Sequence, residues 1–226
     1  KPLLKINNLS IISHVFKKAE EANIGQVFVA TENQEIMEDV IKNGGKAVLT
    51  GNHKTGTDRI FEAYKKLNLK NINYILNLQG DEPDIEKNDI INLNNLMIRN
   101  NAEIGTLAAK IKDDKMLNNK NVVKVITEGK LGKNNFLRAL NFTRKNLSKS
   151  NENIYHHIGI YLFKATVLEK FINLDQTKNE KKHKLEQLRA LDNKLKIQVA
   201  LAKFSPIGVD TKQDYLDIKN KLEYKS

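Results

Sequence analysis

The sequence of 226 residues contains no cysteine. This absence excludes a disulfide framework and a cysteine nucleophile. The sequence also lacks any apolar run that approaches the roughly 18 residues of a membrane-spanning helix, and no signal peptide is visible in it. We therefore expect a cytoplasmic protein without a membrane span.

Several catalytic motifs are absent as well. The chain has neither the Walker pattern G-x-x-x-x-G-K-[ST] nor the dinucleotide-binding pattern G-x-G-x-x-G. It has no nucleophile elbow and no credible Ser–His–Asp arrangement. A covalent enzyme intermediate is therefore not expected.

Positive charge is in excess, with 38 Lys and Arg against 27 Asp and Glu and a formal net charge of +11. Such an excess is often found in proteins that bind nucleic acid. Here it is nearly all lysine and is spread along the chain, whereas a nucleic-acid footprint concentrates arginine and aromatic residues on one stripe. The charge thus favours a small anionic ligand, and no nucleic-acid partner is expected.

Strand and helix patterns alternate over the first hundred residues, which is typical of a doubly wound α/β sheet. The hydrophobic content of 40% and the chain length suit one sizeable domain. The pattern predicts strands at 24–30, 46–50 and 72–80 and helices at 34–43, 59–67 and 85–100.

The middle of the chain has a different pattern. Strand-like segments follow one another with only short interruptions, at 103–111, 121–128, 136–144 and 154–164. Consecutive strands of this kind predict an antiparallel extension of the sheet, which we place at 112–165. The remaining elements are predicted helices at 166–174, 184–193 and 212–222 and a strand at 196–203. Because no linker is visible, we expect a single domain, 1–226, with a mixed, mainly parallel sheet.

Two carboxylates follow buried strands at the sheet edge where ligands of open α/β sheets bind. Asp81 ends the stretch YILNLQGD, and Asp210 follows the strand at 196–203 after a short loop. Converging carboxylate oxygens suit Mg²⁺, which takes one or two carboxylates together with substrate phosphates and water. The alternative is structural: Asp81 would start a turn, and Asp210 would cap the last helix.

The segment HKTGTDR (53–59) joins a strand to a helix and offers hydroxyls, a glycine backbone and an arginine. Exposed amides at such a junction suit an anion or the edge of a base. The alternative is an ordinary loop in which Thr57 caps the helix.

Histidines and a polar helix supply further candidates. His156 and His157 are adjacent on one strand, so they point to opposite faces and at most one enters any given pocket. A zinc site would need more convergent ligands than the sequence provides. The segment LEQLR (185–189) predicts an amphipathic helix whose Glu186, Gln187 and Arg189 lie on a solvated side.

Six segments occur in the order and spacing of one known family. They are HKTGTDR (53–59), NLQGDEP (77–83), ALNFTR (139–144), HHIGIYLF (156–163), LEQLR (185–189) and GVDTKQDYLDI (208–218). In these segments, and over essentially its whole length, the chain resembles the cytidylyltransferases of 3-deoxy-manno-octulosonate (KDO).

This resemblance implies a reaction in which CTP and KDO give CMP-KDO and diphosphate, with Mg²⁺ and without a nucleophile on the enzyme. It implies that Asp81 and Asp210 hold the metal and that Lys1 takes part in catalysis. The implied nucleotide-binding residues are Thr55, Gly56, Arg59 and Gln79, and the implied sugar-binding residues are Arg144, His157, Tyr161, Glu186 and Gln187. It further implies a homodimer built partly on 112–165 and a role in lipopolysaccharide biosynthesis.

The chain departs from the family pattern at three places. The family has a first strand and a loop resembling PARxxSxRLPGK, of which only the last residue is present, as Lys1, so we expect an N-terminally truncated chain with a weakened phosphate grip. Thr55 stands where the family usually has serine, which keeps the hydroxyl. The Ile-Pro that usually follows Arg144 is missing, and the segment before LEQLR is unusually basic, so the sugar side departs more than the nucleotide side.

Three other functions stay open. The sugar could be a different acidic sugar, such as a sialic acid or an amino-substituted KDO. The chain could be a non-catalytic nucleotide-binding homologue that has lost its phosphate loop, or a basic protein that binds RNA or DNA with a steep salt dependence.

Overall fold

The computed structural model describes residues 1–111, 114–147 and 153–223. Its chain forms two compact units, each of which is assembled from separate stretches of sequence. The first unit comprises Lys1–Ile72, Asn77–Ile91 and the C-terminal segment from Pro206, and the second comprises Asn73–Leu76 and Asn92–Ser205. In the described part of the chain, no helix is both long and apolar enough to cross a membrane.

The first unit begins with a short hairpin of β1 (Lys5–Ile6) and β2 (Leu9–Ser10). Its two turn residues, Asn7 and Asn8, both have positive φ, which is the geometry of the tight turn that suits a two-residue hairpin loop. Helix α1 (Ile11–Glu21) follows directly, because the Ser10 side chain accepts a hydrogen bond from the Ser13 amide and caps it.

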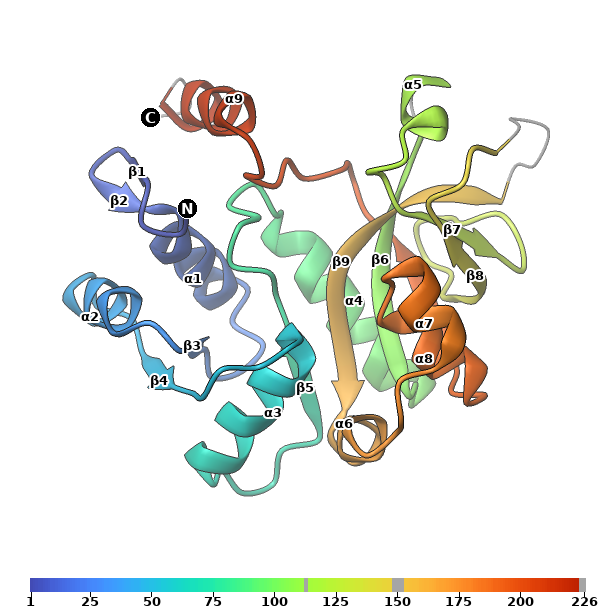
Figure 1. The fold of residues 1–226 in the computed structure, drawn as a ribbon, viewed down its shortest axis with the longest axis horizontal. Coiled ribbons are helices and arrows are strands. Elements are labelled where there is room, and N and C mark those ends of the chain that lie inside the picture. Colours follow the sequence, from blue (N-terminus) through green and yellow to red (C-terminus); the bar gives the residue numbers. More distant parts are fainter. Residues whose placement is uncertain (112–113, 148–152, 224–226) are drawn as a thin grey trace. The chain divides into compact units, whose positions relative to one another are not determined.

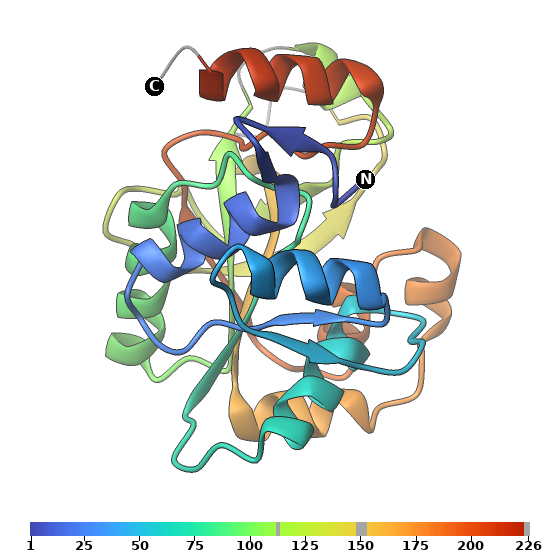
Figure 2. The same ribbon diagram turned by 90° about the vertical axis from the view of Figure 1, so that its left-hand side faces the viewer.

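Helix α1 organises the core of the first unit from two faces. On one face, Ile12 and Phe16 pack with Val40 of α2 (Gln34–Lys42) and with the parallel pair of strands β3 (Val29–Thr31) and β4 (Ala47–Leu49). On the other, Ile11 clusters with Ile218 of α9 (Lys212–Glu223). In Figure 2 the strand pair runs beneath α2, in the blue and cyan part of the chain. Helix α3 (Gly56–Leu67) completes this unit.

The second unit is built on a six-stranded sheet with the order β5-β9-β6-β10-β8-β7, in which β9 also pairs with β7 (Figure 1). Its strands are β5 (Tyr74–Asn77), β6 (Ile104–Lys110), β7 (Lys124–Thr127), β8 (Leu137–Thr143), β9 (Ile154–Lys164) and β10 (Ile197–Leu201). Its helices are α4 (Lys87–Asn100, which begins in the first unit), α5 (Asp114–Asn118), α6 (Ala165–Ile172), α7 (Lys178–His183) and α8 (Gln187–Asp192).

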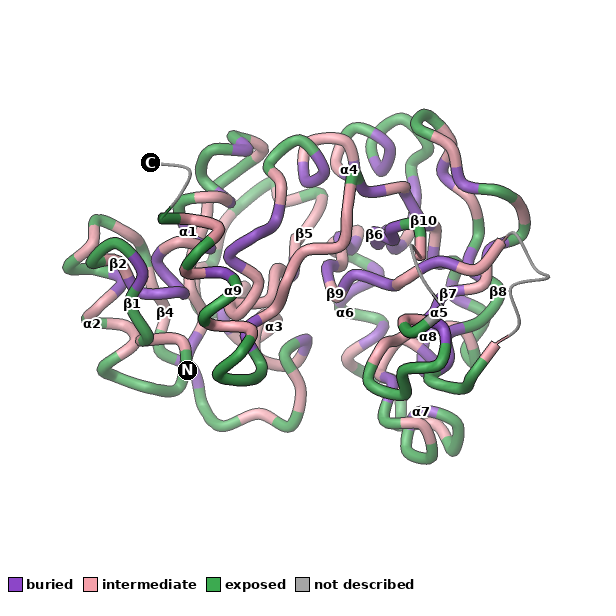
Figure 3. The backbone as a smooth tube through the Cα atoms, turned by 90° about the horizontal axis from the view of Figure 1, so that it is seen from above, coloured by how far each residue is buried: buried purple, intermediate pink, exposed green. Residues whose placement is uncertain are grey.

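The central strands of this sheet are almost completely buried, as Figure 3 shows in purple for β6. Helix α4 approaches β6 at Gly105, where an added Cβ would lie only 2.5 Å from the sulfur of Met97 and 2.9 Å from the ring of Phe136. A Cβ at this position would therefore force the side chains of Met97 and Phe136 to move.

The prediction of a mixed α/β sheet is confirmed, but the sheet is not mainly parallel. In the six-stranded sheet β10 and β6 are parallel, whereas β6–β9, β10–β8, β7–β8 and β7–β9 are antiparallel. Strands β9 and β8 account for this difference equally, because each runs antiparallel to two neighbours in these pairs. The doubly wound arrangement stays a prediction, and part of the predicted extension, 112–113 and 148–152, lies outside the described residues.

The sequence analysis predicts one domain because it finds no linker, and that prediction stays open. The chain passes between its two compact units inside or next to β5 and α4, and again between Ser205 and Pro206, where a single proline marks the crossing. None of these crossings has the composition of a linker.

Candidate functional site

The two strand-end carboxylates predicted from the sequence are brought together in the first unit. The backbone N–H of Val209 donates to the carbonyl oxygen of Asp81 at 2.9 Å, so the segment before Asp210 runs beside the QGDEP turn. Gly208 lies close to the same turn, since a Cβ there would be 3.8 Å from Cγ of Glu82. The two segments thus form one polar edge in this unit.

The electrostatics of this edge favour a bound cation. Burial raises the pKa of Asp81, and the negative charge of Asp210 raises it further, against an opposing effect of Lys1. The Lys1 ammonium lies 3.3 Å from Oδ1 of Asp210 at an exposed position. One exposed lysine only partly offsets the repulsion between the two carboxylates, so a divalent cation would stabilise both.

A third carboxylate, Glu82, lies at the same edge and was not among the predicted site residues. Burial, followed by the charges of Asp81 and Asp210, raises the pKa of Glu82 to about 7. Its Oε2 is buried and accepts no hydrogen bond from the described residues. The only signal in the sequence is its position directly after Asp81.

The residues fit a magnesium ion that shares its ligands with substrate. In the described parts of the chain, no group of three or more His, Cys, Asp or Glu side chains could hold a metal by itself. A site with one or two carboxylates plus substrate phosphates and water is the usual arrangement for Mg²⁺. Asp81 and Asp210 therefore fit this metal better than a zinc ion, which takes at least three protein ligands, usually including His or Cys.

Asp210 does not cap the last helix, which was the structural alternative for this residue. Thr211 caps α9: its hydroxyl accepts the Asp214 amide at 3.1 Å, and the Asp214 carboxylate accepts the Thr211 amide at 2.7 Å. This is the reciprocal pattern of a capping box with an aspartate. The Asp210 side chain is left facing Lys1.

The HKTGTDR segment starts α3 with a cap that differs from the predicted one. Thr55 is the N-cap: its hydroxyl accepts the Asp58 amide at 3.1 Å and donates to the Asp58 carboxylate at 2.8 Å. Thr57 is buried one residue into the helix. Gly56 begins the helix, and a Cβ on it would lie 4.0 Å from Nε2 of Gln79, so three predicted nucleotide-binding residues are grouped here.

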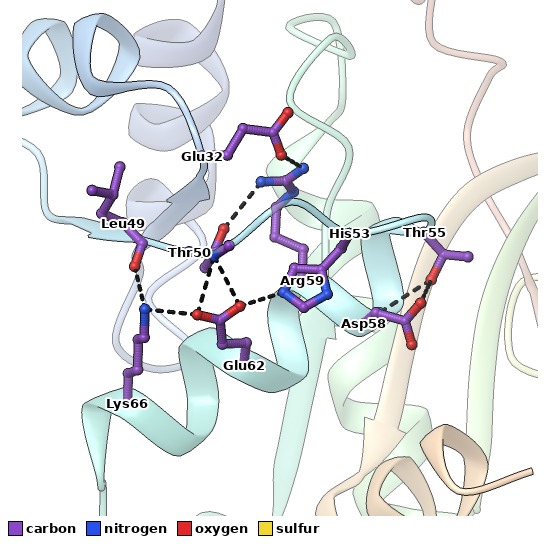
Figure 4. Close-up of polar contacts among 10 residues, drawn as sticks. Glu32, Leu49, Thr50, His53, Thr55, Asp58, Arg59, Glu62 and Lys66 are labelled. Atoms are coloured by element: carbon purple, nitrogen blue, oxygen red, sulfur yellow. Dashed lines mark hydrogen bonds and ion pairs between the residues drawn. The ribbon is translucent and has the colours of Figure 1, made fainter.

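Arg59, the fourth predicted nucleotide-binding residue, already has partners within the first unit. Its guanidinium donates to the Thr50 hydroxyl at 3.0 Å and forms an ion pair with Glu32 (Figure 4). These contacts tie α3 to the ends of β3 and β4. The guanidinium side chain is 20% exposed and remains next to solvent.

A second network on α3, centred on Glu62, was missed by the sequence analysis. The Glu62 carboxylate accepts hydrogen bonds from the Gly51 amide, His53 and Lys66, and Figure 4 shows it between the last two. The hydrogen bond from Lys66, followed by that from His53, lowers the pKa of Glu62 to about 2. The network holds the start of the HKTGTDR segment against α3. The signal in the sequence was the spacing of Glu62 and Lys66, which are four residues apart on one side of the helix.

In the second unit, His157 lies beside Tyr161, another predicted sugar-binding residue. It is 8% exposed, its ring packs edge-on against Phe142 and beside the ring of Tyr161, and its Nε2 lies 3.1 Å from the Thr106 hydroxyl. His156 points to the other face, where its Nδ1 lies 2.7 Å from the Ser205 hydroxyl. The prediction that the two histidines diverge is therefore confirmed.

Tyr161 and Glu186 lie in the same neighbourhood. The Tyr161 hydroxyl is buried and makes no hydrogen bond of ordinary geometry among the described residues. Burial, followed by the charge of Glu186, raises the pKa of this phenol well above its ordinary value, against a smaller opposing effect of the nearby Thr106 hydroxyl. Glu186 immediately precedes α8, which Gln187 begins. An unpaired buried hydroxyl carries an energetic cost that a ligand can remove.

The prediction that Arg189 lies on a solvated side of the LEQLR helix is wrong. This residue is 3% exposed and forms a double hydrogen bond with the Glu180 carboxylate, at 2.9 and 2.6 Å. Its guanidinium also stacks on the ring of Phe171 and lies 3.7 Å from Glu186. Helical spacing could not reveal this burial, because α7 covers the polar side of α8.

Arg144 and Lys124 add positive charge to the second unit. Arg144 is exposed and donates to the carbonyl of Asn121 at 2.7 Å, and its charge helps to lower the pKa of His157, an effect that burial dominates. Lys124, which the sequence analysis missed, is fully buried and donates to the carbonyls of Asn119 and Arg144. The two cations thereby cross-link the start of β7 to the end of β8.

Comparison with known proteins agrees with this geometry. A family model described as cytidylyltransferase matches residues 1–197. Among curated proteins, the chain is 39% identical to a 3-deoxy-manno-octulosonate cytidylyltransferase of Bartonella bacilliformis, covering 98% of this chain and 91% of that protein. It is 41% identical to the enzyme of the same description from Thermodesulfovibrio yellowstonii, with 95% and 88% covered.

Solved structures show the same relationship. The chain resembles CMP:2-keto-3-deoxy-manno-octonic acid synthetase complexed with CTP, with a TM-score of 0.89 and 29% identity over 100% of this chain and 92% of that one. It also resembles an apo UDP-glucose pyrophosphorylase, with a TM-score of 0.72 over 100% and 90% of the two chains. At 12% identity, that second likeness concerns the fold alone.

Proposed function

This chain belongs to the 3-deoxy-manno-octulosonate cytidylyltransferase family, and from this premise we propose that it catalyses the reaction of that family. The reaction joins CTP and KDO into CMP-KDO and diphosphate. A sugar hydroxyl oxygen attacks the α-phosphorus, the bond from that phosphorus to the diphosphate oxygen breaks, and the hydroxyl proton is released. The enzyme contributes positioning and charge neutralisation.

Asp81 and Asp210 are the proposed ligands of Mg²⁺. Bound there, the ion would supply neutralisation of the phosphate charge that develops during transfer. The two carboxylates are oriented by the backbone hydrogen bond between Val209 and Asp81, and Lys1 lies within 3.3 Å of Asp210. We assign Lys1 to the phosphates of CTP, since an exposed ammonium suits a polyanion as a point charge.

The nucleotide is assigned to the start of α3 and the QGDEP turn. The backbone at Thr55 and Gly56 begins a helix of 12 residues, so its first amides are directed at an incoming anion or base edge. The Gln79 side-chain amide lies close to Gly56 and can both donate and accept hydrogen bonds. Arg59, tied to Glu32 and Thr50, adds positive charge at the same helix end.

The acidic sugar is assigned to the second unit. Arg144 is the proposed partner of its carboxylate, because a guanidinium can bind a carboxylate through two parallel hydrogen bonds. His157, Tyr161, Glu186 and Gln187 would bind its hydroxyls. The unpaired hydroxyl of Tyr161 supports this assignment, since a sugar hydroxyl would satisfy it.

The convergence of Asp81 and Asp210, with the raised pKa of Asp81, is the single observation that carries this proposal. The test is diphosphate release from CTP, with and without Mg²⁺, in the presence of KDO, a sialic acid or an amino-substituted KDO. We expect Mg²⁺-dependent release with KDO. Diphosphate release with another acidic sugar but not with KDO would support the proposed mechanism and contradict KDO as the substrate. No release with any of these sugars would contradict the proposed reaction and favour a non-catalytic nucleotide-binding homologue.

Two wider assignments follow from family membership. CMP-KDO would serve lipopolysaccharide biosynthesis, and the chain would form a homodimer through part of 112–165. Light scattering of the purified protein at several concentrations tests the second assignment. A mass that remains that of one chain would contradict it.

A further inference from the structure

Strands β6 and β9 pair antiparallel with an irregularity at one point. Thr106 faces Tyr161, but the next residue of β6, Leu107, faces Ile158. Strand β9 therefore carries two extra residues, Gly159 and Ile160, opposite a single step of β6. Such a bulge bends the strand locally and changes the direction of the side chains beside it.

The bulge explains why His157 and Tyr161 meet. In a regular strand, residues four positions apart are about 13 Å apart along the strand. Here the centres of the two rings are only 5.4 Å apart. The proposed sugar site therefore depends on this irregular piece of backbone being held in place.

The Thr106 side chain contacts the backbone of the bulge. Its hydroxyl oxygen lies 2.6 Å from the carbonyl of Ile160, 3.2 Å from that of Ile158 and 3.1 Å from Nε2 of His157. Thr106 is completely buried, so no water competes for these contacts. One hydroxyl thus joins both sides of the bulge to the histidine ring.

The chemistry of these contacts determines where the protons lie. A hydroxyl has one proton to donate, and a carbonyl can only accept. At 2.6 Å from the Ile160 carbonyl, the Thr106 proton is donated there, because two oxygens that close would otherwise repel. The Thr106 oxygen can then only accept from His157, so Nε2 of His157 carries a proton.

A proton on Nε2 also determines the state of Nδ1, the other ring nitrogen of His157. Burial, followed by the charges of His156 and Arg144, lowers the pKa of His157 to about 3, so the ring is neutral near pH 7. A neutral ring with its proton on Nε2 has an unprotonated Nδ1. No hydrogen bond to this Nδ1 occurs among the residues that the structure describes.

We propose that Thr106 is a positioning residue of the sugar site: it holds the β9 bulge and keeps His157 as the Nε2-protonated tautomer, so that Nδ1 accepts a hydrogen bond from a sugar hydroxyl. This proposal rests on the proposed function for the identity of the ligand. The tautomer and the bulge themselves do not depend on it.

The variant Thr106→Val tests the proposal, because valine keeps the shape of threonine and removes the hydroxyl. Long-range nitrogen–proton correlation spectra of the histidine rings, assigned with His157→Gln, report the tautomer without any substrate. We expect the wild-type protein to show His157 protonated at Nε2 and the variant to lose this preference. We also expect the KM for the sugar to rise about tenfold, the equivalent of one hydrogen bond of about 1.4 kcal/mol, while the KM for CTP stays within twofold.

Two variants serve as controls. Thr106→Ser retains the hydroxyl and should behave like the wild type in both measurements. Thr127→Val removes another buried threonine hydroxyl of the same sheet, one that bonds the carbonyl of Gly129 at 2.7 Å. It should leave the His157 signal and the sugar KM unchanged, so that a general loss of stability is separated from a loss of positioning.

The outcomes separate this proposal from the proposed function. A wild-type His157 protonated at Nδ1, or a Thr106→Val variant that keeps both the tautomer and the sugar KM, overturns the role of Thr106. If Thr106→Val unfolds, the result for Thr106→Ser decides. Loss of the Nε2 proton of His157 in Thr106→Ser overturns the role of Thr106, because that variant keeps the hydroxyl. A wild-type protein that has the expected tautomer but turns over no acidic sugar contradicts the proposed function instead.

Discussion

In the first unit, the ion pair nearest the candidate carboxylates lies at the surface, whereas in the second unit the ion pair beside the candidate residue Glu186 is buried. The ion pair of Lys1 and Asp210 shows the first kind, with side chains that are 55% and 80% exposed. The pair of Arg189 and Glu180 shows the second, with 4% and 5%. Both pairs join a basic and an acidic residue, so burial is the main difference between them.

This difference in burial predicts which polar groups are already fixed by partners before the substrates bind. Exposed groups keep their hydration, so Lys1 and Asp210 can separate at little cost in free energy when a polyanion and a cation bind. Buried polar groups must find partners when the chain folds, so His157 of the second unit is oriented by Thr106, and Arg189 by Glu180, before any ligand binds. Changes in the first unit should thus alter activity with little effect on stability, and changes in the second should alter both.

The largest expected effect is on the buried ion pair of the second unit. Arg189→Met leaves the Glu180 carboxylate buried without its partner, and we expect the free energy of unfolding to fall by about 3–5 kcal/mol. Urea denaturation followed by circular dichroism measures this loss. The double variant Glu180→Met/Arg189→Met removes both charges and should recover part of it; if the double variant is as unstable as the sum of the two single variants, the pair does not act as a unit.

The second expected effect is on catalysis in the first unit. Asp81→Asn keeps the shape of the side chain and removes the charge that we assign to Mg²⁺. We expect the rate of diphosphate release to fall by a factor of about 100 to 1000, which corresponds to about 3–4 kcal/mol of transition-state stabilisation. The melting temperature should not fall, because the repulsion between Asp81 and Asp210 is removed.

Asp217→Asn is the matched control for Asp81→Asn. Asp217 is an exposed acid on α9 whose carboxylate accepts from Gln213 at 2.8 Å. This variant should keep the wild-type rate. An Asp81→Asn enzyme with nearly full activity would remove this carboxylate from the metal site.

Acid should act on the second unit through His157. The folded protein holds its pKa at about 3, whereas an unfolded histidine titrates near 6.5. Below pH 6.5 the unfolded chain therefore binds a proton that the folded chain does not, and the free energy of unfolding falls as the pH falls. From pH 6.5 to 5.5 this contribution amounts to about 1 kcal/mol.

Urea denaturation of the wild type and of His157→Gln at these two pH values isolates that contribution. The variant should lose about 1 kcal/mol less than the wild type on acidification. His183→Gln, a change at the last residue of α7, is the control and should retain the wild-type dependence. Equal dependence in all three proteins would mean that His157 is not held in its neutral form by the fold.

The smallest expected effect on stability is that of Lys1. Because the pair with Asp210 is exposed, Lys1→Ala should change the free energy of unfolding by less than about 0.5 kcal/mol. A rise in the KM for CTP, with Lys1→Arg closer to the wild type, would support its assignment to the phosphates. A destabilisation of several kcal/mol would contradict the contrast drawn between the two units.

The spacing of apolar residues along the chain predicted the positions of several candidate site residues, but it did not predict the residues that surround them. The alternation of apolar residues predicted a strand at 154–164, and the structure has it at Ile154–Lys164. The same alternation placed His156 and His157 on opposite faces, because successive side chains of a strand diverge whatever its neighbours are. The positions of Asp81 and Asp210 after apolar strands likewise depend on short segments only.

Tertiary structure alone decided which polar groups are buried and what they meet. The contact that orients His157 joins residues 51 positions apart, and the burial of Arg189 depends on Glu180 of a separate helix. The directions of the strands in the six-stranded sheet and the assembly of each unit from separate segments are also set by such distant pairings. The spacing of apolar residues predicts which side of a helix or strand faces the core. It does not predict which distant residues contact the polar side. Thr106 and Lys124 were therefore invisible in the sequence, because what each does comes from the backbone carbonyls that folding brings to it.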